Sequence, residues 1–459
     1  MIIFMICKFV QICNLAILQK TLYSISMKNL KNKIELLAPA GNLEKLKTAL
    51  THGADAVYAG IPDFSLRVRI NDFDLKKIAE ATEYCHARGK KIYITINIFA
   101  HNKHLQKLPP YIRELKKIGV DALIISDPGV IALVKEIWSS AEIHLSTQAN
   151  CTNWQAAKFW YELGVKRVIL GRETTLAEIK EIKKRVPKLD LEVFVHGAMC
   201  MAYSGRCFLS KYFVDRSGNL GDCVQPCRWK YNINQKSKIK NQNDEVEEVF
   251  YISEEKRPGQ PLELVEEEHG SYILNSKDLC LLKYLKDLQA AGVMSFKIEG
   301  RAKSAYYQAM VTGVYARVIR DLKKISKTEI NKLYRDLENK IVSRGFTTGF
   351  ILDGKGEQDT ENPHRQIAWQ FCGVVHSLEK LSANQVMVKV HNEIRLGDEL
   401  EIILPFYEIK KLKVKKMWDA KNGEVIAEAH GGAGGKSVIL ELKGGAPEFS
   451  VIRRFANYK

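Results

Sequence analysis

The stretch Leu191-Glu-Val-Phe-Val-His196 leads without a break into Gly197-Ala-Met-Cys200-Met-Ala-Tyr-Ser-Gly-Arg-Cys207. The first part is a short apolar run with β-branched residues, which is typical of a buried strand. The second part is rich in glycine and thiols, which a strand interior does not favour. The stretch therefore predicts a buried strand that delivers polar and thiol side chains to one edge of a sheet.

Seven similar runs share this pattern and alternate with amphipathic helical segments from Ile34 onward. We expect strands at 34–38, 56–60, 91–98, 122–126, 142–148, 167–170, 191–196 and 296–298. Helices are expected at 43–52, 75–89, 110–119, 154–164 and 176–186, several of them ending in glycine. Eight β-α units predict an α/β fold with a TIM-like (β/α)8 barrel. A doubly wound parallel sheet is the alternative.

Polar residues at the ends of the predicted strands favour the barrel. They are Asn97, Asp127, Gln148 with Asn150, Arg172 with Glu173, His196, and Glu299 with Arg301. TIM barrels place their active sites at the carboxyl ends of the strands. We therefore expect these side chains to meet at the mouth of a barrel.

The cysteine segment begins an insertion, at about 197–292, between the seventh and eighth strands. Such connections usually have only a few residues, so the insertion is expected to add to the barrel mouth. Within it, 236–268 is highly charged and contains Pro258-Gly-Gln-Pro261, which predicts exposed turns or a hairpin.

From Gly345 the chain becomes rich in strands, which predicts a small C-terminal β-barrel domain at 345–459 after the barrel at 34–344. The strands are expected at 372–377, 385–390, 399–403, 412–417 and 438–442. His430-Gly-Gly-Ala-Gly-Gly-Lys-Ser437 resembles a phosphate loop, but His430 replaces the first glycine and a strand follows. We predict a hairpin loop there.

Residues 1–33 form an N-terminal extension that we expect to be disordered or a start-site artefact, with Met27 as an alternative start. The first 26 residues are apolar but are interrupted by Lys8 and Gln11, so they make a poor signal peptide. No window of 18 uninterrupted apolar residues occurs, so no membrane span is expected. We predict a cytoplasmic protein.

Four of the ten cysteines fall within 28 residues, at Cys200, Cys207, Cys223 and Cys227. Thiolates bind soft metals. The spacing C-x6-C-x15-C-x3-C lacks the C-x2-C pairs of most zinc sites, so it favours a 4Fe-4S cluster over zinc. Disulfides would need an oxidising compartment and are the weakest alternative.

The chain is strongly basic, with 70 Lys and Arg against 53 Asp and Glu and a formal net charge of +17. Such a charge attracts polyanions and favours nucleic acid among macromolecular partners. Basic residues gather at 228–240 and 410–416, with Trp229, Tyr231 and Trp418 nearby for stacking. A solvated lysine-rich surface is the simpler alternative.

Several long motifs resemble the collagenase-like U-32 peptidase family, and more closely its tRNA-hydroxylation branch. They are Glu35-Leu-Leu-Ala-Pro-Ala-Gly-Asn42, Gly53-Ala-Asp-Ala-Val-Tyr-Ala-Gly60, Ser146-Thr-Gln-Ala-Asn150, Met199 to Cys207, Cys223-Val-Gln-Pro-Cys-Arg-Trp229, Asn275-Ser-Lys-Asp278 and Lys297-Ile-Glu-Gly-Arg301. The resemblance runs from about Ile34 to the C-terminus. It implies oxygen-independent hydroxylation of wobble uridine to 5-hydroxyuridine in tRNA, with prephenate as the oxygen donor.

The resemblance also assigns residues and partners. It makes Cys200, Cys207, Cys223 and Cys227 the cluster ligands, with Cys280 as a spare candidate. It implies tRNA and the iron-sulfur assembly machinery as partners, and it leaves room for an electron donor or a partner protein.

The remaining candidate residues follow from their places near strand ends and thiols. Arg172, Arg206, Lys297 or Arg301 would pair with a carboxylated donor, unless Glu173 or Glu299 holds them in structural ion pairs. Tyr203 and His196, with Arg206, are the candidate catalytic residues for stacking or proton transfer. Gln148, Asn150, Arg172, Lys297, Glu299 and Arg301 are the candidate substrate-binding residues.

Two other functions compete with hydroxylation. The family's name implies a peptidase, but the chain has no G-x-S-x-G or H-E-x-x-H motif, and ligated cysteines are not available as nucleophiles. The other is an RNA-binding protein in which the metal is only structural.

Overall fold

The computed structural model describes most of the chain from Ile34 onward. The described residues are 34–62, 64–65, 72–200, 202, 206–207, 209–220, 222–229, 231–240, 246–255, 257–264, 276–352, 367–376, 382–432 and 435–456. The predicted N-terminal extension at 1–33 and the candidate residue Tyr203 lie outside them. Within the described part, no helix is long and apolar enough to cross a membrane.

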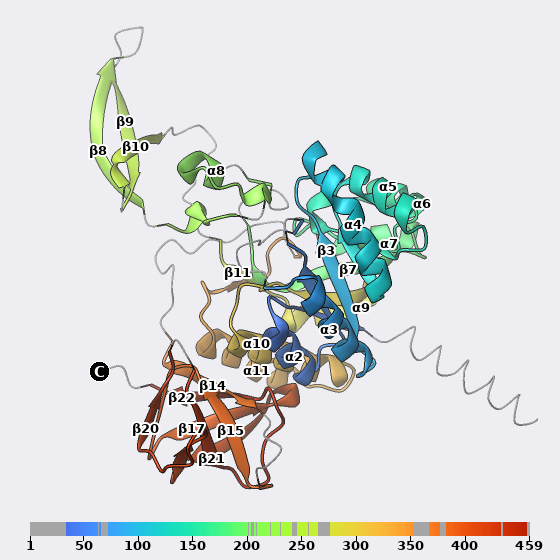
Figure 1. Cartoon of the computed structure of the whole chain (residues 1–459). Helices are drawn as coiled ribbons and strands as arrows, with labels where there is room; N and C mark the ends of the chain where they lie inside the picture. The colour runs from blue at the N-terminus through green and yellow to red at the C-terminus, as the bar shows by residue number, and fades with distance from the viewer. Residues whose placement is uncertain are drawn as a thin grey trace, which may run out of the picture.

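Eight parallel strands close into a barrel, which confirms the predicted fold class (Figure 1). They are β1 (Glu35–Pro39), β2 (Ala56–Gly60), β3 (Lys91–Ile96), β4 (Ala122–Ile125), β5 (Ile143–Leu145), β6 (Arg167–Ile169), β7 (Asp190–Ala198) and β12 (Val293–Ile298). Each strand pairs with the next, and β12 closes the ring by pairing with both β7 and β1. Because the strands are parallel, their carboxyl ends share one face of the barrel.

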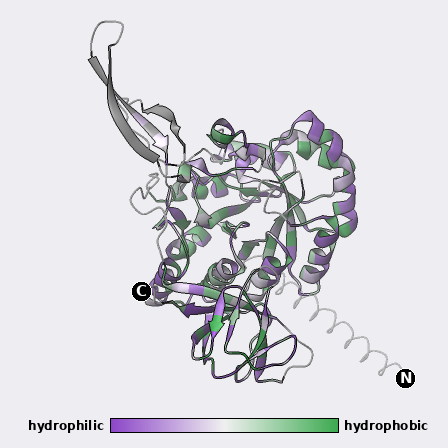
Figure 2. Ribbon diagram, turned by 60° about the vertical axis from the view of Figure 1, so that its left-hand side comes forward, coloured by the Kyte–Doolittle hydropathy of each residue, from purple (hydrophilic) through white to green (hydrophobic). Residues whose placement is uncertain are grey.

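Helices surround the barrel. They are α2 (Leu43–Thr51), α3 (Leu75–His86), α4 (Asn102–Ile118), α5 (Pro128–Ile137), α6 (Trp154–Glu162), α7 (Leu176–Arg185), α9 (Leu285–Ala290), α10 (Ala305–Arg320) and α11 (Lys327–Lys340). Most bury one face, whereas α10 is buried on nearly all sides. Figure 2 shows hydrophobic and hydrophilic residues alternating around these helices. The barrel strands are buried along most of their length, so the main core lies between strands and helices.

One helix differs from its prediction. We expected a helix to begin at Pro110, but α4 begins at Asn102 and contains both Pro109 and Pro110. Proline lacks the backbone N–H that an interior helical position donates, which is why it suggested a start. Packing overrides this preference, since α4 buries Leu108, Ile112 and Leu115.

The described part of the insertion after β7 begins with a short helix, two 3-10 turns, the first of them η4 (Gly218–Leu220), and a small sheet. α8 (Leu209–Val214) and the 3-10 turn η5 (Pro226–Arg228) precede a three-stranded antiparallel sheet of β8 (Tyr231–Lys240), β9 (Val246–Glu254) and β10 (Arg257–Leu264). Figure 1 shows this sheet projecting away from the barrel. Pro258–Pro261, which we predicted as turns or a hairpin, falls inside β10, where the pairing with β9 shifts its register.

Two further short strands extend the barrel sheet beyond β7. β11 (Asp278–Cys280) pairs antiparallel with the end of β7, and β13 (Phe346–Thr347) pairs with β11. The sequence did not predict them, because strands of two or three residues leave almost no periodic signal. They brace the end of β7 from which the cysteine segment leaves.

The C-terminal domain is an antiparallel β structure. Its seven-stranded sheet has the order β18 (Glu408–Lys413), β17 (Glu399–Leu404), β22 (Val451–Phe455), β14 (Trp369–His376), β15 (Gln385–Val390), β21 (Ser437–Glu441) and β19 (Met417–Asp419). β16 (Glu393–Arg395) and β20 (Glu428–His430) form a separate pair. The predicted strand at 412–417 is divided between β18 and β19.

The glycine-rich segment after His430 is not the predicted hairpin loop. It links β20 to β21, which belong to different sheets. A strand follows it, as expected, and no helix begins there.

A buried arginine joins the two domains. Arg453 of β22 is fully buried and donates to the Glu401 carboxylate at 2.6 and 2.9 Å and to the Tyr306 hydroxyl of α10 at 3.3 Å. Tyr306 also donates to the Lys340 carbonyl at 2.7 Å. A buried charge with this many partners resists separation, so the β domain is fixed to the helices of the barrel.

Candidate functional site

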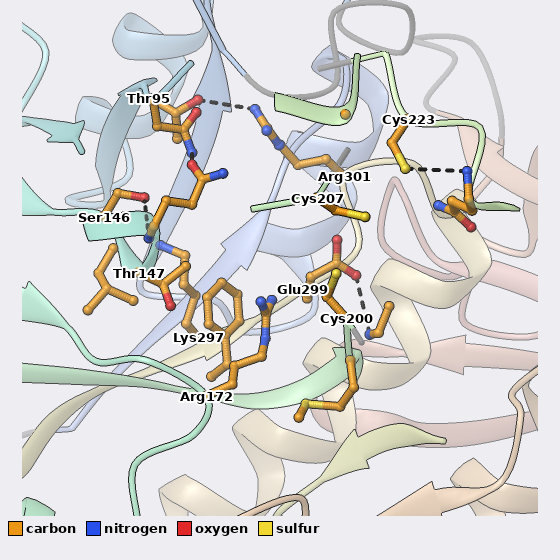
Figure 3. A pocket seen from close by; sticks show the side chains of 18 of the residues that line it. Thr95, Ser146, Thr147, Arg172, Cys200, Cys207, Cys223, Lys297, Glu299 and Arg301 are labelled. Carbon is orange, nitrogen blue, oxygen red and sulfur yellow. Dashed lines mark hydrogen bonds between the residues drawn. The ribbon is translucent and has the colours of Figure 1, made fainter. Parts of the chain in front are cut away.

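One pocket lies at the carboxyl ends of the barrel strands, where the polar strand-end residues were predicted to meet. Residues from seven strands or the loops that follow them line one side, and the cysteine segment lines the other (Figure 3). The lining residues are Tyr58, Thr95, Asn97, Ile124, Ser146, Thr147, Gln148, Ile169, Arg172, Phe194, Ala198, Met199, Cys200, Cys207, Leu209, Gly218, Cys223, Gln225, Pro226, Cys227, Lys297, Glu299 and Arg301.

On the strand side, hydrogen bonds fix the polar groups. Arg301 is only 9% exposed and donates to the Thr95 hydroxyl at 3.1 Å. The Asn97 amide donates to the Gln148 side-chain carbonyl at 2.9 Å. Each pair links the ends of two strands that are not adjacent in the barrel, β12 with β3 and β3 with β5, so the closed barrel sets their positions.

A charged layer lies below the pocket, inside the barrel. Lys297 donates to the Glu192 carboxylate at 2.8 Å, and Arg167 donates to the other Glu192 oxygen at 3.0 Å and to Glu35 at 2.5 Å. Burial opposes the ionisation of Glu192, but Lys297 and Arg167 hold the pKa of this carboxyl at about 2. Burial lowers the pKa of Lys297, and Glu192 opposes that shift.

Arg172 and Glu299 complete the strand side. The Arg172 guanidinium lies 4.0 Å from the centre of the Phe194 ring, a cation-π contact. A Glu299 carboxylate oxygen accepts from the Ala198 backbone N–H at 3.4 Å. The charge of Lys297 is balanced by Glu192, and the two guanidinium groups of Arg172 and Arg301 exceed the one carboxylate of Glu299 in the lining, which favours an anionic ligand.

The four thiols of Cys200, Cys207, Cys223 and Cys227 all line this pocket. Cys200 is exposed and the other three are partly buried. Backbone N–H groups donate to two sulfurs, from Leu209 to Cys207 at 3.4 Å and from Gln225 to Cys223 at 3.3 Å. Such bonds stabilise thiolates and tune metal clusters.

A few contacts attach the cysteine segment to the barrel. Arg206 donates two hydrogen bonds to the Gln148 backbone carbonyl, at 2.8 and 3.1 Å. The Cys207 backbone N–H donates to the Asn219 side chain at 3.1 Å, and the Asn219 carbonyl accepts from the Phe99 N–H at 3.2 Å. Ser276 donates to the Met199 carbonyl at 3.1 Å.

The four thiols are not gathered closely enough to hold a single zinc ion in this arrangement. Tetrahedral zinc with bonds of about 2.3 Å needs sulfurs roughly 3.8 Å apart. Among the described residues, the only group of three or more ligand atoms within 4.8 Å of one another is Glu393, Glu428 and His430. The four sulfurs are therefore spread more widely than zinc requires.

Of two neighbouring residues, one agrees with a group bound between the thiols. An added Cβ at Gly218 would lie 3.3 Å from the Cys223 Cβ and 3.6 Å from its sulfur, so the Gly218 backbone packs closely against this cysteine. Within the described part of the chain, the buried Asn219 side-chain N–H2 has no hydrogen-bond partner. A donor in this position suits an acceptor held by the thiols.

The structure brings most of the predicted site residues together. Cys200, Cys207, Cys223, Cys227, Gln148, Arg172, Lys297, Glu299 and Arg301 all line the pocket. Arg206 and Asn150 do not line it. Arg206 instead anchors the cysteine segment, and Asn150 adopts a left-handed conformation, with φ of 60°, at the end of a short 3-10 turn.

His196 and Cys280 lie away from the pocket, in the core behind it. β7 bulges against β12 between Phe194 and His196, so the alternation of faces is broken and His196 contacts Tyr307 and Tyr315 of α10. Burial lowers the pKa of His196 to about 3. Burial raises the pKa of the Cys280 thiol to about 11. The structure therefore supports neither proton transfer by His196 nor metal binding by Cys280.

Some lining residues were not predicted, namely Tyr58, Thr95, Ser146, Thr147 and Phe194. The Thr95 side chain accepts from Arg301, and the Tyr58 hydroxyl donates to the Ile298 carbonyl at 3.0 Å. Both belong to predicted strands. Since alternate residues of a barrel strand face the interior, this alternation could have identified them.

Comparisons with known proteins identify a family and several relatives of this chain. The model of Peptidase family U32 matches residues 41–361, and that of the Peptidase family U32 C-terminal domain matches 368–453. The chain is 41% identical to tRNA hydroxylation protein P of Escherichia coli over 87% of its own length and 92% of the relative's. It is 36% identical to tRNA hydroxylation protein P1 of Bacillus subtilis over 87% of its length and 90% of the relative's.

A third relative is the 23S rRNA 5-hydroxycytidine C2501 synthase of Escherichia coli, at 32% identity over 81% of this chain and 53% of that protein. Together the two family models span both the barrel with its cysteine segment and the C-terminal β domain. The chain therefore belongs to the peptidase U32 family.

Proposed function

We propose that this protein hydroxylates RNA, and specifically that it converts wobble uridine of tRNA to 5-hydroxyuridine. Relatives named as tRNA hydroxylation proteins and an rRNA hydroxycytidine synthase support this proposal. The formal charge of +17 suits a polyanionic substrate.

The observation that carries the proposal is the shared lining of one pocket. Four thiols face a set of strand-end side chains that includes three cations and the Gln148 amide. Replacing the C5–H bond of a pyrimidine by C5–OH removes two electrons from the ring, which side chains alone do not achieve. A 4Fe-4S cluster held by Cys200, Cys207, Cys223 and Cys227 would supply this redox capacity.

The chain's own residues would bind and orient the reactants. Arg172, Lys297 and Arg301 favour a carboxylated oxygen donor, for which we propose prephenate. The Gln148 amide, held by Asn97, offers hydrogen-bonding groups to an extruded base. The strand-end residues Gln148, Lys297 and Arg301 are buried, and charge contacts are stronger at buried positions than at the surface.

The pocket fits a peptidase less well. Among the described residues that line it there is no histidine, and a cysteine or serine nucleophile needs a nearby base. The cysteines outside the segment that are described are all buried, and burial raises the pKa of Cys85, Cys151 and Cys372 to about 12. Low-pKa nucleophilic thiols have the opposite property.

The proposal includes partners besides tRNA. Cluster loading would require the iron-sulfur assembly machinery, and the two electrons removed from the ring require an electron-transfer partner or co-substrate.

Nucleoside analysis of tRNA tests the proposal. A strain lacking this gene should lose 5-hydroxyuridine, and the wild-type gene should restore it. A Cys200→Ala, Cys207→Ala double variant should not restore it, although it is expressed at the same level. Unchanged 5-hydroxyuridine in the deletion strain would contradict the proposed reaction.

A further inference from the structure

Three aromatic side chains form a connected group on the elements that carry the cysteines. The Tyr212 and Phe213 ring centres lie 5.5 Å apart at 75°, and those of Phe213 and Trp229 lie 5.8 Å apart at 53°. Tyr212 and Phe213 belong to α8, and Trp229 directly follows η5. We call these three residues the aromatic rim.

The elements that hold the aromatic rim also line the pocket. Leu209, the first residue of α8, is a lining residue, and so are Pro226 and Cys227 of η5. Figure 1 shows α8 between the barrel and the projecting sheet of β8, β9 and β10. In sequence, the aromatic rim is therefore within a few residues of the pocket lining, since Tyr212 lies one helical turn after Leu209 and Trp229 lies two residues after Cys227.

Tyr212 is far more exposed than an aromatic residue that packs in a core. Its exposed fraction is 72%, the highest among the large hydrophobic side chains given as exposed in the described part. Phe213 and Trp229 are partly buried beneath it. The Tyr212 ring makes a T-shaped contact with Phe213 and still keeps most of its surface exposed.

In a basic protein, an exposed aromatic ring near the pocket suits binding of unpaired RNA. Bases of unpaired RNA stack on aromatic side chains, and each such contact contributes about 1–3 kcal/mol. An enzyme that acts on a base must take it out of the stack, which leaves the flanking base without one neighbour. Tyr212 presents a replacement for that neighbour.

We propose that the Tyr212 ring, supported by Phe213 and Trp229, stacks on an unpaired nucleotide that flanks the target base. This inference rests on the proposed function, because that function makes RNA the ligand. It assigns the aromatic rim to RNA binding and leaves the chemistry to the pocket.

The test compares RNA binding by three variants of the full-length, metal-loaded protein. Tyr212→Leu removes the ring, Tyr212→Phe keeps it, and Phe159→Leu is the matched control because Phe159 of α6 is 55% exposed. The ligand is a fluorescently labelled anticodon stem-loop with unpaired uridine, and the measured quantity is Kd at fixed salt.

We expect Tyr212→Leu to weaken binding by roughly 5-fold to 100-fold, with Tyr212→Phe and Phe159→Leu close to wild type. Iron content should be the same in all four proteins. A stem-loop with an abasic nucleotide beside the target should bind the wild type weakly. Its Kd should rise little further when Tyr212→Leu replaces the wild type, because the stacking partner is already missing.

Wild-type affinity in Tyr212→Leu, or an equal loss in Tyr212→Phe, would overturn the stacking role. These outcomes leave the hydroxylase proposal intact, because that proposal is decided by 5-hydroxyuridine in cells. The converse result is also distinguishable. If stem-loop binding by the purified protein depends on the Tyr212 ring, but the deletion strain keeps its 5-hydroxyuridine, the stacking role is supported and the hydroxylase proposal is contradicted.

Discussion

The two walls of the pocket are built in different ways. The strand wall consists of buried side chains, such as Lys297 at 3% exposure and Gln148 at 6%, which barrel strands position. The cysteine wall consists of a six-residue helix, short 3-10 turns and partly exposed thiols. The strand wall is ordered by packing, whereas the cysteine wall depends on a few hydrogen bonds.

This difference indicates where a bound metal group would contribute to stability. A ligand that binds only the folded state stabilises it, and metal ligation can order short segments that lack a core. We therefore expect removal of the metal to disorder the cysteine wall and to leave the barrel folded. The following predictions test each wall in turn.

The largest expected effect is on the strand wall. Glu192→Gln leaves the buried Lys297 and Arg167 without their shared carboxylate, so it should lower the free energy of unfolding by about 3–5 kcal/mol. Urea denaturation of the metal-free proteins measures this. Glu162→Gln, in the exposed Lys158–Glu162 pair, is the control and should cost at most about 0.5 kcal/mol. Equal losses in the two variants would refute the importance of the charged layer.

The same carboxylate predicts a pH dependence. Since the folded-state pKa of Glu192 is about 2 against an ordinary value of 4.5, its contribution is fully present above pH 4.5 and is lost as pH falls toward 2. The stability difference between wild type and Glu192→Gln should therefore shrink across this range. A difference that stays constant from pH 6 down to pH 3, measured by urea denaturation at each pH, would contradict the assignment.

A smaller effect is expected for the anionic ligand. Arg172→Met removes a guanidinium held over Phe194, so kcat/KM for the carboxylated donor should fall by roughly 10-fold to 100-fold, mainly through KM. Arg113→Met, at an exposed position of α4, should leave it unchanged. Anaerobic assays with the donor as the varied substrate measure this, and an unaltered KM in Arg172→Met would remove Arg172 from donor binding.

The smallest effect on stability is expected for the attachment of the cysteine wall. Arg206→Gln removes the two hydrogen bonds to the Gln148 carbonyl. Because Arg206 is exposed, the loss should be about 0.5–1 kcal/mol, and unfolding of the barrel should hardly change. Iron should leave the variant several-fold faster than wild type in the presence of a chelator. An unchanged rate of iron loss would show that Arg206 does not position the thiols.

The barrel was predicted well from the sequence because each strand has a recognisable local pattern of residues. Short β-branched runs with polar ends, such as those at 91–98 and 167–170, need no knowledge of distant contacts. The pairs β11 with β13 and β14 with β22 depend on long-range pairing, so no local pattern predicts them. α4 begins before its prolines because packing of Leu108 outweighs their cost.

The candidate site was predictable where residue type alone indicates chemistry, as for the four cysteines and the strand-end cations. It was not predictable where the direction of a side chain decides whether the residue faces the pocket. His196 is the clearest case. A bulge in β7 turns its side chain toward α10, although its place after an apolar run suggested the barrel mouth. The anchoring role of Arg206 depends on a contact with Gln148, 58 residues away in sequence.

Metal analysis of anaerobically purified protein tests the central claim most directly. Wild type, Cys200→Ala with Cys207→Ala, and Cys372→Ala would be compared by iron and zinc content, visible absorption and paramagnetic resonance. Cys372 is buried in the C-terminal domain and serves as the control. We predict iron with broad charge-transfer absorption in wild type and in Cys372→Ala, and its loss in the double variant. Stoichiometric zinc without iron in wild type would contradict the cluster and with it the redox function.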